Sequence, residues 1–99
     1  MFDKTVLKRD FDKYVLDFYQ VHKRFTFEEF GDFATTLLNY YVNAQIIDPQ
    51  YKMEAAYYLT TLYNRGIGNR ITEQDMSTIA RVIAQDHSLD MRVLGKILG

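Results

Sequence analysis

Apolar residues recur at three- and four-residue steps along nearly the whole chain, which is the period of an amphipathic helix. The first such pattern runs from Leu7 to Val21, where the apolar side chains would share one stripe of a helix. Stripes of this kind are stable only when they pack against one another. The spacing therefore predicts an all-α fold, and no segment shows the alternating pattern of a β-strand.

Capping signals divide this pattern into separate helices. Asp3 can cap the first helix, and Thr26 with Glu29 forms a capping box at the start of the second. Phe25 and Phe30 occupy the two positions of a hydrophobic staple around that box. These residues predict two long helices separated by a short connection.

A third helix is predicted from Asp48 as N-cap and Pro49 as first helical residue, continuing through Tyr63. Apolar residues surround nearly its whole circumference, so it is expected either at the centre of the bundle or in an interface with a second copy. Gly66 suits the left-handed conformation that often ends a helix. The sequence leaves both positions for this helix open.

The last third of the chain predicts two shorter helices. Thr72 and Asp75 form a weaker capping box, and Ser88 can cap a final helix. Residues 79–98 then have the outline of a helix-turn-helix. The expected architecture is one compact domain over residues 1–99, with about five helices and a helix-turn-helix-like corner at its end.

Composition narrows the class of protein. Cysteine is absent, which excludes disulfides, thiolate metal sites and cysteine nucleophiles, and suits a reducing compartment. Charges begin at Asp3, so no signal peptide is predicted, and no window approaches the roughly 18 apolar residues of a membrane span. We expect a soluble, cytoplasmic protein. The cysteine-free, aromatic-rich composition is reminiscent of small phage-encoded proteins, although no motif identifies a family.

No catalytic or metal-binding set is predicted. Asp86, His87 and Ser88 are the residue types of a hydrolase triad, but consecutive residues cannot align nucleophile, base and orienting acid. His22 and His87 lie far apart, and neither belongs to a metal-spaced pair. The expectation is a protein that is not an enzyme and needs no metal or cofactor.

Nucleic-acid binding is an alternative. The chain has 12 basic and 13 acidic residues, whereas nonspecific nucleic-acid binders are strongly basic. If residues 88–98 form the reading helix of a transcription regulator, Arg92 and Lys96 would make the contacts. Gly95 would weaken that helix by about 1 kcal/mol relative to alanine.

A second alternative is a nucleotide or anion site in the loop over residues 65–72. Its glycines would let backbone amides approach a phosphate, and Arg65, Asn69 and Arg70 would supply side-chain donors. The loop matches no P-loop or dinucleotide fingerprint. A helix end followed by a turn with solvated arginines explains the same residues.

The leading functional hypothesis comes from the tyrosines. The chain has eight, more than a small core can bury, and exposed tyrosines are common anchors of protein interfaces. The alternative is that they line the edge of the core with their hydroxyls in water. We expect a non-enzymatic regulator, inhibitor or adaptor that binds a protein partner through an aromatic helical face and exists as a homo-oligomer. The candidate interface residues are Tyr40, Tyr41, Tyr51, Tyr57, Tyr58 and Tyr63.

Overall fold

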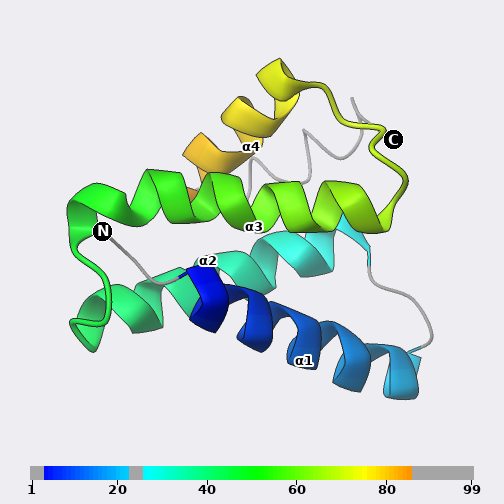
Figure 1. Ribbon diagram of the computed structural model, residues 1–99, viewed down its shortest axis with the longest axis horizontal. Helices are drawn as coiled ribbons and strands as arrows, with labels where there is room; N and C mark the ends of the chain where they lie inside the picture. The colour runs from blue at the N-terminus through cyan, green and yellow to red at the C-terminus, as the bar shows by residue number, and fades with distance from the viewer. Residues whose placement is uncertain (1–3, 23–25, 86–99) are drawn as a thin grey trace.

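The computed structural model describes residues 4–22 and 26–85, and the side chains of 4–17 and 26–85. This part of the chain contains no strand, and its helices confirm the all-α prediction (Figure 1). They are α1 (Lys4–His22), α2 (Phe27–Asn43), the 3-10 turn η1 (Pro49–Tyr51), α3 (Lys52–Gly66) and α4 (Glu73–Ala84). The radius of gyration is 12.6 Å, close to the value of about 13 Å expected for a compact domain of this length. The predicted fifth helix falls on residues 86–99, outside the described part.

Helix α3 is the centre of the fold. The helices α1, α2 and α4 all pack against it, and Figure 1 shows it between α4 and the pair formed by α1 and α2. It allows close approach because it carries small buried side chains, Ala55, Ala56 and Thr60. The Thr60 hydroxyl donates to the Ala56 carbonyl at 2.8 Å, so its burial leaves no unpaired donor. The apolar circumference of the predicted third helix is therefore covered from within the chain.

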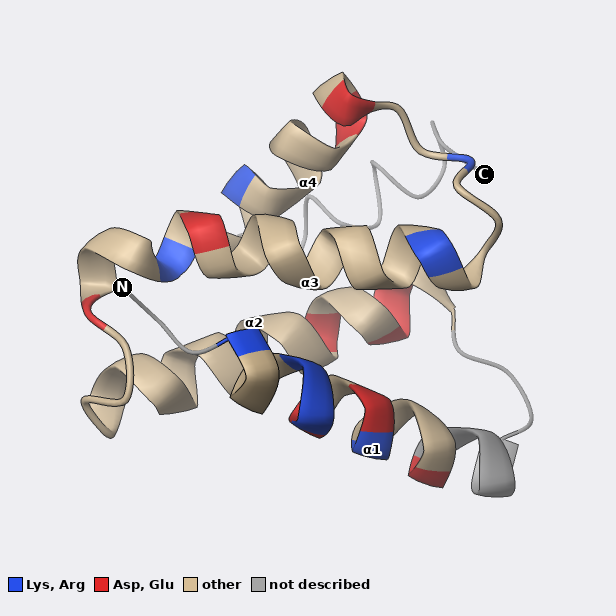
Figure 2. Ribbon diagram, in the orientation of Figure 1, with Lys and Arg blue, Asp and Glu red and all other residues tan. Residues whose placement is uncertain are grey.

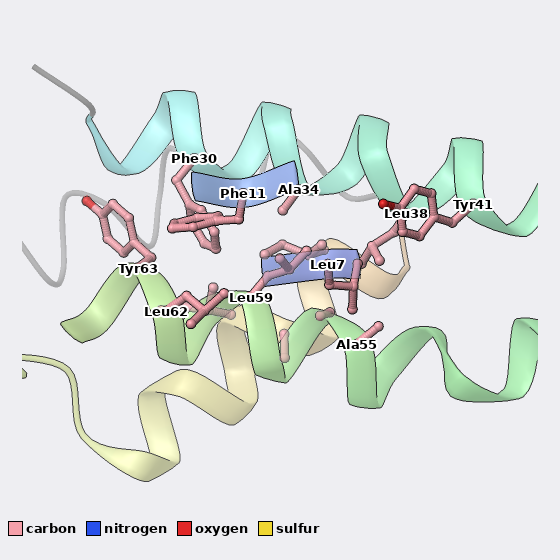
Figure 3. Packing of buried hydrophobic residues seen from close by; sticks show 14 of the residues in the cluster. Leu7, Phe11, Phe30, Ala34, Leu38, Tyr41, Ala55, Leu59, Leu62 and Tyr63 are labelled. Atoms are coloured by element: carbon pink, nitrogen blue, oxygen red, sulfur yellow. The ribbon is translucent and has the colours of Figure 1, made fainter. Parts of the chain in front are cut away.

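The core between α1, α2 and α3 is built around aromatic rings. Phe30 of α2 stacks on Tyr63 of α3 with ring centroids 4.6 Å apart, and Phe11 of α1 meets Phe30 edge-on at 6.2 Å. Figure 3 shows Leu7 and Phe11 lying between the side chains of α2 and α3. Complete burial of a side chain such as Phe30 contributes about 1.5–3 kcal/mol. Removing this ring would therefore affect three helices at once.

Two of the predicted helix starts are confirmed and one is modified. The hydroxyls of Thr26 and Thr72 accept the amides of Glu29 and Asp75, each at 3.2 Å. Asp48 has the extended conformation of an N-cap, but its side chain makes no capping hydrogen bond. The segment after it is a 3-10 turn, so the α-helix begins at Lys52 rather than at Pro49.

Helix α2 ends in a Schellman motif built without glycine. The amide of Gln45 donates to the Val42 carbonyl at 3.1 Å, and that of Ile46 to the Tyr41 carbonyl at 2.9 Å. Gln45 adopts a φ of 61°, the left-handed conformation that costs an L-residue about 1–2 kcal/mol. The turn therefore holds its shape against a local strain.

Helix α3 ends in the same motif, two residues later than predicted. Gly68, with a φ of 89°, donates its amide to the Arg65 carbonyl, and Asn69 donates to the Asn64 carbonyl at 2.8 Å. Gly66 remains within the helix, so its predicted role as the left-handed residue is wrong. The hydrogen-bond ladder continues past Gly66 to Ile67, which moves the left-handed position to the next glycine.

We predict that Gln45→Gly raises the free energy of unfolding by about 0.5–1 kcal/mol, because glycine avoids the steric cost at φ 61° but loses more chain entropy. Urea denaturation followed by circular dichroism measures this. Gln45→Ala is the matched control and should give no gain, since alanine keeps its Cβ. Equal stabilisation by both substitutions would contradict the prediction.

Candidate functional site

The predicted tyrosine face divides into core and surface residues. Tyr41 and Tyr63 are only 3% and 7% exposed, so the prediction of an exposed interface is wrong for these two. Tyr51, Tyr57 and Tyr58 are partly buried against the core. Tyr40, 61% exposed, is the one tyrosine among the described side chains with a largely free surface.

Tyr41 joins α2 to α1 instead of meeting a partner. Its hydroxyl donates to the Asp10 carboxylate, which also lies 3.5 Å from Nε of Arg9. Burial, and then the hydrogen bond to Asp10, raise the pKa of Tyr41 well above its ordinary value of about 10. The phenol is therefore held protonated in the folded state as a structural donor.

We predict that Tyr41→Phe lowers the free energy of unfolding by about 1–2 kcal/mol at neutral pH, because it removes a hydrogen bond to a carboxylate. A raised tyrosine pKa stabilises the fold below pH about 10, and this contribution disappears as the pH rises above that value. The stability difference between wild type and Tyr41→Phe should therefore shrink in alkali. The exposed Tyr40→Phe is the control, and equal losses in both variants would contradict the assignment.

The loop after α3 is organised by the buried side chain of Asn64. Its Oδ1 accepts the Ile71 amide at 2.9 Å, and its Nδ2 donates to the Ile71 carbonyl at 3.2 Å. The same Nδ2 lies 3.5 Å from Sδ of Met76. One asparagine thus closes the loop from α3 to α4 by pairing both backbone groups of Ile71.

Several backbone amides of the predicted anion site are already paired within the chain. The amides of Ile67, Gly68 and Asn69 donate to carbonyls at the end of α3, and that of Ile71 donates to Asn64. At the start of α4, the first turn already carries the carboxylates of Glu73 and Asp75. The side chains of Arg65, Asn69 and Arg70 are exposed around the loop. The four amides named above are not available to an anion, because they donate within the chain.

We predict that Asn64→Ala lowers the free energy of unfolding by about 1–3 kcal/mol, because it leaves both backbone groups of Ile71 without their partner. Amide hydrogen exchange at Ile71 should become faster in this variant. The exposed Arg70→Ala, in the same loop, should change neither quantity. Unchanged exchange at Ile71 in Asn64→Ala would show that the loop is held by other contacts.

Exposed apolar side chains concentrate at the opposite end of α3, where the chain passes from α2 to α3. The exposed large hydrophobic residues of the described part are Leu16, Tyr40, Ile46 and Met53, with exposed fractions from 61% for Leu16 and Tyr40 to 37% for Met53. Leu16 belongs to α1, and the other three lie at the end of α2, in the turn and at the start of α3. We call Tyr40, Ile46 and Met53 the end patch.

The strained turn presents the end patch. The left-handed residue Gln45 turns the chain so that Ile46 is 49% exposed while the next residue, Ile47, is 4% exposed. In a Schellman motif the residue in the position of Ile46 packs near the last turn of the helix, the turn that carries Tyr40. The backbone conformation thus selects which of two consecutive isoleucines faces outward.

Acidic side chains flank the end patch. Asp48 and Glu54 are both exposed, and no ion pair to either is found among the described residues. The intervening cation, Lys52, donates to Oδ1 of Asn39 at 2.6 Å and ties α3 to α2. The surface at this end of the molecule is therefore apolar with acidic neighbours.

The sequence predicts only one residue of this surface, Tyr40. Ile46 and Met53 belong to none of the predicted sites. A doublet of isoleucines between a helix end and Asp48–Pro49 is the only available signal. The other predicted contacts, Arg92 and Lys96, lie outside the described residues, as does the reading helix over 88–98.

Neither a metal site nor a membrane-spanning helix is found in the described part of the chain. No group of three histidine, aspartate or glutamate side chains there is placed to hold a metal ion. No helix in that part of the chain has the length and apolar character to cross a membrane. Comparison of the chain with protein families, curated proteins and solved structures finds no match.

Proposed function

We propose that this chain is a small non-enzymatic interaction protein, a regulator, inhibitor or adaptor, that binds a protein partner through the end patch. The supporting observation is that three of the four exposed large hydrophobic side chains in the described part of the chain lie at one end of the bundle. Clustered apolar side chains with polar neighbours are typical of binding surfaces, whereas single ones are common on any protein.

The charges around the end patch define the chemistry of the partner. Asp48 and Glu54 favour a segment in which an apolar side chain is accompanied by lysine or arginine. The apolar side chain would contact Ile46 and Tyr40, and the cations would meet the two carboxylates. Apolar contacts at the centre would supply most of the affinity, and the charges at the edge would favour the correct partner.

A second copy of the chain fits this surface less well than a basic partner. A two-fold symmetric dimer would bring together two surfaces that both carry Asp48 and Glu54. Stable dimers also bury about 800 Å² on each subunit, a larger area than three partly exposed side chains provide. The proposed occupant is therefore a different protein, with self-association as the competing result.

Photo-crosslinking tests this proposal. A benzophenone amino acid at position 46 should capture a partner from the native host, whereas the same group at Leu16, exposed on α1, should not. A peptide from the captured region should contain apolar and basic residues and bind the purified protein in calorimetry. Ile46→Ser should weaken that binding by about tenfold or more, and Leu16→Ser by less than about twofold.

Three results would contradict the proposal. Equal loss of peptide binding in Ile46→Ser and Leu16→Ser would show that the end patch is not the contact surface. Capture of an acidic segment would contradict the role of Asp48 and Glu54. A dimer in light scattering that dissociates in Ile46→Ser would assign the patch to a second copy.

A further inference from the structure

Cationic side chains gather on a different surface, where α1 packs beside α3. Lys4 and Lys8 are one turn apart on α1, and Tyr58 and Arg65 are two turns apart on α3. Figure 1 shows the two helices running in the same direction, and Figure 2 shows the basic positions on both. Nζ of Lys4 lies 5.5 Å from the centre of the Tyr58 ring, so the Lys4 and Lys8 positions of α1 lie beside the Tyr58 and Arg65 positions of α3.

Electrostatic interactions connect the rest of this cluster. The pKa of Lys8 is raised, first by its hydrogen bond to Asp12 and then by the charge of that carboxylate. Since α1 and α3 run in the same direction, Lys8 lies one turn beyond Lys4 towards the end of α3 that carries Arg65, and the charge of Arg65 makes the smallest contribution to the Lys8 pKa, lowering it. We call Lys4, Lys8 and Arg65, together with Tyr58, the basic strip.

The charges of the basic strip are incompletely balanced. Lys8 pairs with Asp12 at 2.6 Å, whereas no ion pair to Lys4 or Arg65 is found among the described residues. All three cations are exposed. Like charges held close together repel one another, and an anion placed between them would relieve that repulsion.

We propose that the basic strip binds an acidic segment of a protein, with carboxylates about one helical turn apart. Lys4 and Lys8 have the four-residue spacing that would meet such a pair, since residues at this spacing lie about 5–6 Å apart on a helix. Arg65 would accept a carboxylate in bidentate geometry, and the Tyr58 ring would keep Lys4 close to the strip. This binding is independent of the end patch, which favours a basic partner.

The charge distribution favours an acidic protein segment over nucleic acid. A duplex presents a continuous row of phosphates, and binding it strongly takes many cationic contacts. Here Asp10, Asp12 and Asp17 interleave with the cations along α1, and the whole chain has a net charge of −1. A short segment can place two or three carboxylates on the basic strip without meeting all of these acids.

Fluorescence anisotropy with a defined probe tests the proposal. The probe is a labelled helical peptide carrying glutamate pairs at four-residue spacing, with its glutamine counterpart as control, in about 50 mM salt so that screening is moderate. The combined variant Lys4→Gln, Lys8→Gln and Arg65→Gln should weaken binding about tenfold, since each exposed ion pair contributes a few-fold. The control variant Lys13→Gln, Arg70→Gln and Arg81→Gln, with the same change in net charge, should have less than about a twofold effect.

Each alternative has its own result. Equal weakening in the two triple variants would show that net charge alone attracts the peptide, and would overturn the assignment to the basic strip. No binding of the glutamate peptide by the wild type would overturn it as well. Tighter binding of duplex DNA of matched charge, lost only in the first triple variant, would assign the strip to nucleic acid. Ile46→Ser should leave glutamate-peptide binding unchanged, so the two surfaces are tested separately.

Discussion

The packing of three helices around α3 is the constraint on which the rest of the structure depends. Small buried side chains on α3 let the neighbouring helices approach, and Leu59 is fully buried among them. The aromatic stack of Phe30 on Tyr63 then fixes α2 against α3, and the edge contact of Phe11 with Phe30 packs α1 against both. A helix surrounded in this way has little apolar surface left for a partner, so the proposed binding surfaces lie at one end of it and beside it.

The two ends of α3 show how backbone geometry and side-chain chemistry cooperate. Before its start, Gln45 at the end of α2 directs Ile46 outward and Ile47 into the core. At its end, Gly68 and then Asn69 adopt left-handed conformations, and Asn64 pairs with Ile71 to close the loop. The first turn exposes apolar surface, and the second pairs several of its backbone amides within the chain.

The proposed surfaces differ in charge and follow different physics. The end patch combines exposed Ile46 and Tyr40 with acidic neighbours, so apolar burial would dominate its affinity. The basic strip combines Lys4 and Arg65 with the Tyr58 ring, so its affinity would depend strongly on salt. A protein with both could hold two partners of opposite charge, which is consistent with an adaptor.

The sequence by itself determined the helical class and the starts of two helices. It also limited the third helix to two positions, the centre of the bundle or an interface with a second copy. Periodicity and capping are local, since the residues that decide them lie within a few positions of one another. Thr26 and Thr72 therefore act as predicted. The end of α3 differs from the prediction. Either Gly66 or Gly68 could supply the left-handed residue, and the choice depends on where the helical hydrogen bonds stop.

Only the tertiary structure decided which side chains remain at the surface. Tyr40 and Tyr41 are adjacent and chemically identical, yet one is exposed and the other donates to Asp10 on a helix thirty-one residues away. Ile46 and Ile47 are separated in the same way by one left-handed residue. Lys4 and Tyr58 meet only because α1 packs on α3. Exposure depends on contacts between distant segments, and no local pattern in the sequence records those contacts.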